Sequence, residues 1–359
     1  MQKSLTIRKG ALWIIAGLAI LTLVTVFVFR AELMSLHSLQ KVDRYGFYTM
    51  EYTSDYGFDE FLEVGASSDK ELIQFIVRKI LKGLPIHVDE AKLTCTTFNA
   101  VTPKGDYVFG RNFDLYYSPG LLVHTKPANG YESLSIVNLA FLGYKGDYMP
   151  DQLFNRIQAL AAPYAPMDGM NEKGLSVAIL LLPDKPTNQQ TKRPDITSTT
   201  AIRLLLDKAA TVDEAVALLK QYDMHDSAGA CYHYQIADAG GKSVIVEYVN
   251  NEMHLIKPKV SYQACTNFYQ TPGAKYYFGM GQNRYAIAMT GLTAKNGVLT
   301  EQDAMHLLKE ARLVNSFVKK TGITYRTQWS AVYNNTRKSM DLCVGQNYGK
   351  VYQYSVTGQ

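Results

Sequence analysis

The amino-acid sequence predicts an α+β fold in which helices cover antiparallel sheets. Strand patterns occur in pairs joined by short turns, and amphipathic helical patterns separate these pairs. Short turns join antiparallel strands, whereas parallel neighbours need a crossover of about a dozen residues or more. With 359 residues, of which 47% are apolar, the chain can bury one large core or two modest ones.

Composition excludes several other classes of protein. The 37 Lys and Arg residues against 32 Asp and Glu leave a net charge of only +5, which together with the apolar content excludes a disordered chain. The 26 Gly and 12 Pro exclude a collagen-like chain, and four cysteines are too few for a disulfide scaffold. No block of Lys and Arg is dense enough to indicate nucleic acid, so we expect no nucleic-acid partner.

The N-terminal region predicts membrane attachment. Residues 11–29 carry no charge and, at about 1.5 Å per residue, nearly span a hydrocarbon core of about 30 Å. Lys3, Arg8 and Lys9 precede this run, which places the N-terminus in the cytoplasm. We therefore expect residues 1–30 to form a cytoplasmic stub and one transmembrane signal-anchor helix, with the catalytic domain extracytoplasmic. The alternative is a cleaved signal peptide and a secreted protein.

A helix is predicted over residues 68–82, after a polar and aromatic stretch at 31–67 that has no clear periodicity. Ser68 and Glu71 form a capping box, which satisfies backbone N–H groups of the first turn. The apolar residues that follow are spaced by three and four, so one face of the helix is apolar. These residues are Leu72, Ile73, Ile76, Val77, Ile80 and Leu81.

The remaining elements follow in order along the chain. Turn residues at 102–105 and 238–242 predict two hairpins, and Thr211 with Glu214 forms a second capping box. No internal repeat and no long flexible linker interrupt this part. The expected elements are strands 96–101 and 107–110, helices 200–209 and 211–222, strands 232–237 and 243–249, a helix over 301–313, and β structure over 327–356.

Motifs for metal and phosphate chemistry are missing from the sequence. None of the seven His residues forms an H-x-x-x-H or H-x-H pattern, and the four cysteines make no C-x-x-C. There is no P-loop and no G-x-S-x-G motif. We expect neither a metal nor a cofactor.

Cys95 is the best candidate for a reactive group. If the hairpin forms, Arg111 and Asp114 of the second strand lie beside the thiol, and a nearby Arg lowers the thiol pKa from about 8.5. The alternatives are a buried structural cysteine and a simple Arg–Asp salt bridge. The residues near Cys95 in the sequence favour neither the functional nor the structural interpretation of this cysteine. A thiol protease is disfavoured, because the sequence lacks the His base and signature that such enzymes need.

The residues around Cys95 resemble the start of the mature choloylglycine hydrolases. These enzymes include bile salt hydrolases and penicillin V acylases, and they are related to acid ceramidase and N-acylethanolamine acid amidase. The resemblance rests on C-T-T-F at 95–98, G-R-N-F-D at 110–114 and D-G-M-N-E-K-G-L at 168–175. Weaker similarities continue in order to about residue 356. They lie at Asp238–Glu247, Cys265–Asn267, Asn283–Tyr285 and Thr327–Tyr333.

The resemblance implies an N-terminal nucleophile hydrolase of linear C–N amide bonds, with a four-layer αββα sandwich of two antiparallel sheets. By this resemblance Cys95 is the nucleophile, and its own α-amine, with a pKa near 8, is the base. Arg111 would stabilise the thiolate and Asp114 would orient the amine. Asn267 would donate to the tetrahedral oxyanion, and Arg284 matches an arginine near the nucleophile.

Maturation is expected because Cys95 is internal. Autocatalytic cleavage of Thr94–Cys95 would leave residues 95–359, which are 265 residues long, as the amidohydrolase domain and residues 31–94 as a pro-segment. One departure from the family concerns Leu181, which stands where bile salt hydrolases carry a second Asn. A leucine side chain cannot donate a hydrogen bond, so bile salt specificity is not expected.

The expected substrate is a small N-acyl amide with an apolar acyl group, because the 11–29 anchor places the domain against a bilayer. Fatty acyl, phenoxyacetyl and steroid acyl groups all remain open. The alternative function is a catalytically silent surface protein that binds amphipathic ligands. Pairing among Cys231, Cys265 and Cys343 cannot be deduced from spacing, and a homo-oligomer stays open because relatives commonly assemble.

Overall fold

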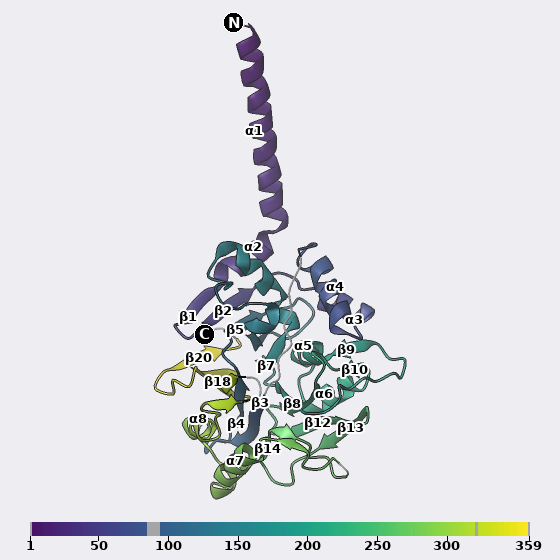
Figure 1. Ribbon diagram of the computed structural model, residues 1–359, viewed down its shortest axis with the longest axis vertical. Helices are drawn as coiled ribbons and strands as arrows, with labels where there is room; N and C mark the ends of the chain where they lie inside the picture. The colour runs from purple at the N-terminus through teal and green to yellow at the C-terminus, as the bar shows by residue number, and fades with distance from the viewer. Residues whose placement is uncertain (1, 85–93, 274, 320–321, 358–359) are drawn as a thin grey trace.

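The computed structural model describes residues 2–84, 94–273, 275–319 and 322–357. Two stacked sheets form the body, and a long N-terminal helix projects away from it (Figure 1). The helices are α1 (Gln2–Val28), α2 (Arg30–Ser38), α3 (Phe58–Val64), α4 (Asp69–Lys79), α5 (Ser198–Lys208), α6 (Val212–Leu219), α7 (Gln282–Ala294) and α8 (Glu301–Glu310), with 3-10 helices η1 (Leu139–Leu142) and η2 (Leu153–Tyr164).

The larger sheet has nine strands. It is antiparallel except where β2 pairs with β5, and a parallel pair is feasible there because a long connection, which contains α3, α4, β3 and β4, separates the two strands. In spatial order the strands are β1 (Gln40–Asp43), β2 (Phe47–Tyr52), β5 (Gly120–Thr125), β6 (Ser133–Asn138), β7 (Pro166–Asn171), β8 (Ser176–Leu182), β11 (Cys231–Ala237), β12 (Ser243–Val249) and β13 (Glu252–Ile256).

The second sheet has seven strands and is antiparallel throughout. Its path runs β14 (Gln263–Cys265), β3 (Thr94–Val101), β4 (Tyr107–Leu115), β18 (Ile323–Asn334), β19 (Ser339–Val344) and β20 (Val351–Ser355), and β17 (Ser316–Val318) pairs with β18. Two short pairs complete the strands: β9 (Asp195–Thr197) with β10 (Asp223–His225), and β15 (Asn267–Phe268) with β16 (Gly279–Met280).

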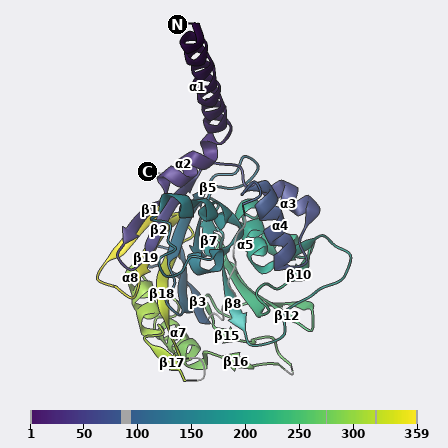
Figure 2. The same ribbon diagram turned by 45° about the horizontal axis from the view of Figure 1, so that its top comes forward.

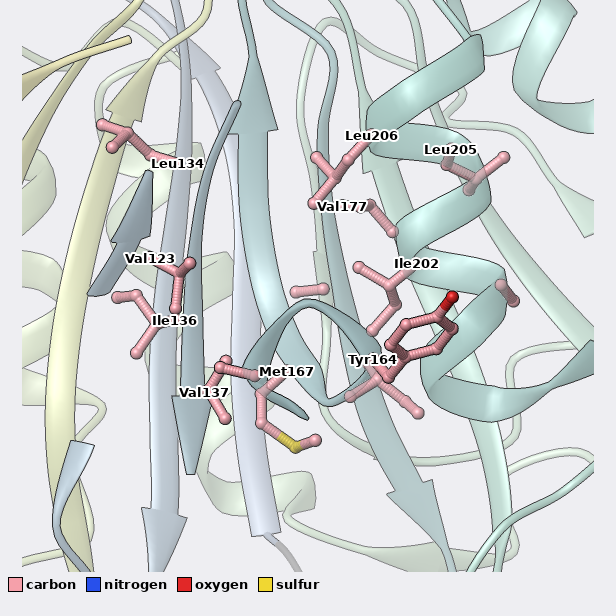
Figure 3. Close-up of a cluster of buried hydrophobic side chains, with 14 of the residues drawn as sticks. Val123, Leu134, Ile136, Val137, Tyr164, Met167, Val177, Ile202, Leu205 and Leu206 are labelled. Carbon is pink, nitrogen blue, oxygen red and sulfur yellow. The ribbon is translucent and has the colours of Figure 1, made fainter. Parts of the chain in front are cut away.

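Helices cover the outer faces of both sheets. Ile202, Leu205 and Leu206 of α5 are buried against the nine-stranded sheet, where Figure 3 shows Ile202 and Leu206 beside Val177 of β8. On the other side, residues of α7 and α8 form a separate buried cluster with β3, β4 and β18. Between the sheets, Thr97 donates to the side chain of Gln235 at 2.5 Å. The predicted α+β architecture of stacked antiparallel sheets is thus confirmed.

The predicted helices and hairpins are present in the structure. The helix expected over 68–82 is α4, and the Ser68 hydroxyl accepts from the Glu71 N–H at its start. The hairpin at 96–110 is β3 with β4, and the hairpin at 232–249 is β11 with β12. The predicted helix pair and the helix over 301–313 are α5, α6 and α8.

The segment before Cys95 is more ordered than its sequence indicated. Residues 40–52 supply two strands to the nine-stranded sheet, although the stretch 31–67 shows no periodic pattern. Helices α3 and α4 lie beside α5 in both views (Figures 1 and 2). They are held by an aromatic cluster in which Phe61 packs edge-on against Phe75 and Tyr164 at centroid distances of 5.3 and 5.6 Å.

The N-terminal helices have the composition of a membrane span only as a pair. Among the described residues, no single helix has the length and hydropathy needed to cross a bilayer. The helical stretches Ile15–Val28 and Arg30–Ser38, bent by 69° at the break between them, meet the criterion together.

Candidate active site

Cys95 lies near the start of β3, between the two sheets. Its thiol is fully buried. Its backbone N–H donates to Oδ1 of Asn267 at 2.7 Å, and its carbonyl accepts a hydrogen bond from Arg284. Both sides of this residue's backbone are therefore held by side chains that are distant in the sequence.

Arg111 faces Cys95 from the neighbouring strand β4, where it stands opposite Thr97. It is fully buried, and its Nε donates to a carboxylate oxygen of Asp168 at 3.3 Å. Neither of its Nη atoms has a hydrogen-bond acceptor within the described residues, and the guanidinium lowers the pKa of the Cys95 thiol. The cation is thus held at one end by a carboxylate and directed at the other toward the sulfur.

Burial dominates the acidity of Cys95 in the intact chain. It raises the thiol pKa to about 11, although the positive charges of Arg111 and Arg284 oppose the rise and the carboxylate of Asp114 adds to it. At neutral pH the thiol is therefore protonated. An attack by this sulfur needs a nearby base to take its proton.

Asp114 and Arg284 form a second buried ion pair at the site, with 3.1 Å between Oδ2 and Nη1. Asp114 also accepts from the Thr327 hydroxyl at 2.5 Å, and Arg284 donates from Nη1 to the Thr96 hydroxyl at 2.8 Å. The predicted role of Asp114, orienting the amine of Cys95, stays a prediction, because the Cys95 N–H of the intact chain donates to Asn267.

Asn267 follows β14 and reaches both sheets. Its Oδ1 accepts from Cys95 N–H and from Nη2 of Arg284, and its Nδ2 donates to the backbone carbonyl of Leu181 at 2.8 Å. The Leu181 position, where the sequence departs from bile salt hydrolases, therefore contacts the site through its backbone. One hydrogen of Nδ2 is used in this bond, and the amide carries a second. The five predicted site residues thus come together.

Asp168 is a site residue that we did not predict, although it opens the D-G-M-N-E-K-G-L motif. It is fully buried on β7 and accepts hydrogen bonds from Arg111, from Trp329 Nε1 at 3.2 Å and from the Tyr333 hydroxyl. The Trp329 ring stacks on Phe113 at a centroid distance of 3.9 Å. Asp168 therefore fixes the guanidinium that faces the thiol.

His233 and Glu247 form another unpredicted pair next to the site. His233 Nδ1 lies 3.1 Å from Glu247 Oε1, and its Nε2 lies 2.6 Å from the carbonyl oxygen of Thr266, the neighbour of Asn267. Both partners are acceptors, so both ring nitrogens carry a proton and the ring is a cation. Burial opposes this charge, but the Cys265 sulfur and Glu247 outweigh it and raise the His233 pKa to about 10.

The other cysteines and the acidic groups provide no further site. The four cysteines all lie in the described part of the chain and are buried without a disulfide. Cys265 lies 3.5 Å from His233 Nε2 and is enclosed by the core. Over the described ranges, no group of three or more His, Cys, Asp and Glu side chains is arranged to hold a metal ion.

Two comparisons with solved structures define the class of fold. Conjugated bile acid hydrolase from Clostridium perfringens matches with a TM-score of 0.53 and 15% identity over 74% of this chain and 94% of that one. Penicillin V acylase from Agrobacterium tumefaciens matches with a TM-score of 0.52 and 18% identity over 73% and 86%. The chain therefore shares the fold of these two enzymes.

The family follows from the sequence comparison. The family model for acyl-coenzyme A:6-aminopenicillanic acid acyl-transferase matches residues 101–348, and the chain belongs to this family. Penicillin V acylase from Pectobacterium atrosepticum is 32% identical over 111 residues, which are 28% of this chain and 29% of that enzyme. The chain thus spans less than a third of this curated relative. The predicted relationship to choloylglycine hydrolases and penicillin V acylases is confirmed.

Replacing Arg111 by Leu is expected to make Cys95 less reactive. Without the guanidinium the thiol pKa rises further, and each added unit lowers the thiolate fraction about tenfold below the pKa. We expect iodoacetamide to label Cys95 of Arg111→Leu at pH 9 about tenfold more slowly than in the wild type, as followed by peptide mass spectrometry. Arg337→Leu, which removes a half-exposed guanidinium, is the control. General destabilisation can only accelerate labelling, so slower labelling supports the electrostatic role, and an equal rate contradicts it where urea unfolding shows Arg111→Leu to be as stable as the wild type.

The stability of the protein is expected to depend on the charge of His233. Its pKa is raised from about 6.5 in the unfolded chain to about 10, so its stabilisation is complete below pH 6.5 and is lost as the pH rises through 10. Between these values, the unfolding free energy of the wild type should fall relative to His233→Gln by up to about 1.4 kcal/mol per pH unit. Urea unfolding at pH 6, 7.5 and 9 measures this, with exposed His306→Gln as control. If the unfolding free energies of the wild type and His233→Gln changed with pH in parallel, the assignment of a charged His233 would be contradicted.

Proposed function

We propose that this protein is a thiol-dependent hydrolase of linear C–N amide bonds in N-acyl compounds, with Cys95 as its nucleophile. The observation that carries the proposal is the convergence on Cys95 of a guanidinium with two unpartnered nitrogens and of the Asn267 carboxamide. A buried cysteine that only packs needs neither group. The similarity to penicillin V acylase and bile acid hydrolase supports the same reaction class.

The spacing of the two central residues adds support. One solved structure of the bile acid hydrolase carries a cysteine-to-alanine mutation, and another carries an arginine-to-leucine substitution. These two changes lie sixteen positions apart in that enzyme, as Cys95 and Arg111 do in this chain.

The base would come from cleavage of Thr94–Cys95. Hydrolysis of this bond adds one water and converts the Cys95 amide, which cannot accept a proton, into an α-amine with a reference pKa of about 8. The amine is attached to the nucleophile's own Cα, so it can take the thiol proton that burial otherwise retains. Asp114, which already lies opposite Thr94 in the β3–β4 pair, would then be placed to hold the amine.

The reaction would then proceed in two steps. The sulfur attacks the substrate carbonyl and the amine leaves with the proton held by the α-amine, which gives a thioester. Water then hydrolyses the thioester, releases the acid and restores the thiol. The second N–H of Asn267 would stabilise the oxyanion in both steps, a contribution of about 2.7–4 kcal/mol for one such donor.

The membrane attachment stays part of the proposal. We infer that residues 11–29 anchor the chain and that the body lies outside the cytoplasm. Large apolar side chains on α1 are exposed, among them Trp13, Leu23 and Phe27 at 78%, 69% and 68%. The helix projects away from the body, and none of the other described residues covers these side chains (Figure 1). Exposed apolar surface of this extent is typical of a membrane or partner contact.

The proposed function is tested with Cys95→Ala in full-length, detergent-solubilised protein. We expect the wild type to hydrolyse members of a panel of N-acyl amides with fatty acyl, phenoxyacetyl and bile acyl groups, and Cys95→Ala to lose at least about 10³-fold in kcat because its side chain has no nucleophile. Cys343→Ala, which removes an equally buried thiol from the other side of the sheet, should retain activity. Equal hydrolysis by Cys95→Ala would overturn the role of Cys95 as nucleophile, and a wild type that hydrolyses no member of the panel would favour the silent binding protein.

A further inference from the structure

The peptide bond that enters Asn267 is held by a buried cation. Its carbonyl oxygen, which belongs to Thr266, accepts a hydrogen bond from Nε2 of His233 at 2.6 Å. Nδ1 of the same ring lies 3.1 Å from Oε1 of Glu247, and both side chains of this ion pair are fully buried. Because a charged donor makes a shorter and stronger hydrogen bond than a neutral one, the backbone on the N-terminal side of Asn267 is firmly placed.

Glu247 holds the same stretch of chain at its other end. Its Oε1 accepts from the backbone N–H of Gln270 at 2.8 Å. Its Oε2 accepts from the N–H of Thr271 at 2.8 Å and from the hydroxyl of that residue at 2.6 Å. The His233–Glu247 pair, which we call the clamp, therefore fastens residues 266–271 at both ends to strands β11 and β12 of the nine-stranded sheet.

Thr266 also contacts the element that supplies Arg284. Its hydroxyl donates to the carbonyl of Gly281 at 3.2 Å, and Gly281 is the N-cap of α7. Gly281 has a φ of +87°, and a Cβ at this position would lie 2.6 Å from Nη2 of Arg284, so the backbone passes close to the guanidinium. A shift of Thr266 would therefore reach both Asn267 and Arg284, the two side chains that hold the backbone of Cys95.

His233 does not act on the reacting atoms directly. Among the described residues, the partners of its ring nitrogens are Glu247, the carbonyl of Thr266 and the sulfur of Cys265. With a proton on each nitrogen, the ring has no free lone pair with which to take a proton from a thiol. Any effect of His233 on the reaction must therefore pass through Asn267.

We propose that the His233–Glu247 clamp positions Asn267 as the donor to the oxyanion. The inference rests on the proposed amidase function and deepens it, because it names the residues that keep the carboxamide N–H directed at the reacting carbonyl. The Leu181 carbonyl and Arg284 fix the carboxamide itself, whereas the clamp fixes the backbone that carries it. A misplacement of about 1 Å in such a group can cost about 10²-fold in rate.

Removing the donor at position 233 tests this role in catalysis. With full-length, detergent-solubilised protein and the panel amide that the wild type hydrolyses fastest, we expect His233→Leu to lower kcat at least about tenfold and to change KM less than about twofold. The reason is that the oxyanion forms only in the transition state. His233→Gln, whose amide N–H can reach the Thr266 carbonyl, should keep kcat within about threefold of the wild type. An unchanged kcat in His233→Leu, or equal losses in the two variants, would overturn the proposal.

A second buried histidine provides the control for general loss of stability. His225 also has an acceptor at each ring nitrogen, with Asn188 at 2.7 Å and Asp195 at 2.8 Å, but it lies on β10 in a separate two-stranded sheet. His225→Leu should keep kcat within about twofold of the wild type. A fall in kcat as large as that of His233→Leu would contradict a specific role of the clamp.

Hydrogen exchange separates the failure of this proposal from the failure of the amidase function. Cys95→Ala should keep the bond to Thr94, and the N–H at position 95 of the uncut chain donates to Asn267. By mass spectrometry, this N–H should exchange at least about tenfold faster in Cys95→Ala with His233→Leu than in Cys95→Ala, whereas the N–H of Ala331 in β18 should change less than about twofold. That result supports the clamp even if no amide is hydrolysed. Equal exchange at position 95 in the two proteins, or an equal acceleration at Ala331, overturns it, whatever the activity of the wild type.

Discussion

The carboxamide of Asn267 joins the two sheets at the proposed cleavage point. Its oxygen holds the Cys95 N–H of the seven-stranded sheet, and its nitrogen holds the Leu181 carbonyl of the nine-stranded sheet. Arg284 donates to the same oxygen. Each of these groups is buried, and a buried polar group without a partner costs about 1–3 kcal/mol. Together with the Thr97–Gln235 and Arg111–Asp168 bonds between the sheets, this side chain positions Cys95 relative to the second sheet.

Two buried ion pairs surround Cys95 and Asn267, and they explain how a negative charge on the Cys95 sulfur can be accommodated there. Arg111 pairs with Asp168, and Arg284 pairs with Asp114, so the four charges balance before the thiol ionises. Removing one partner of such a pair typically costs about 3–5 kcal/mol of stability, because the other charge is left buried and uncompensated. Asp168 accepts a hydrogen bond from Nε of Arg111, so the two Nη atoms of Arg111 stay available to the sulfur. An ionised thiol would therefore meet a cation that is already in place.

Sequence patterns predicted the elements, and the family resemblance predicted the five residues at the junction. The capping box at Ser68 and the hairpin carrying Cys95 depend on neighbours a few residues apart, which local patterns record. The partners of His233 lie 14 and 33 residues away on other elements, and no periodicity encodes such contacts. From the sequence, Leu181 was only a position that had lost the Asn side chain of bile salt hydrolases. The identity of its side chain could not show that its backbone carbonyl accepts a hydrogen bond from Asn267. The strands before Cys95 were missed because β1 is four residues long without a buried position, and the alternation in β2 covers only residues 48–52.

The most direct test of the account is the intact mass and N-terminal sequence of the purified, active protein. Cleavage at Thr94–Cys95 predicts a 265-residue chain that begins with Cys95 and copurifies with the preceding segment, and it predicts that the amount of this chain tracks amidase activity. Full activity in protein that retains the Thr94–Cys95 bond would contradict the central claim, because the α-amine proposed as the base would not exist.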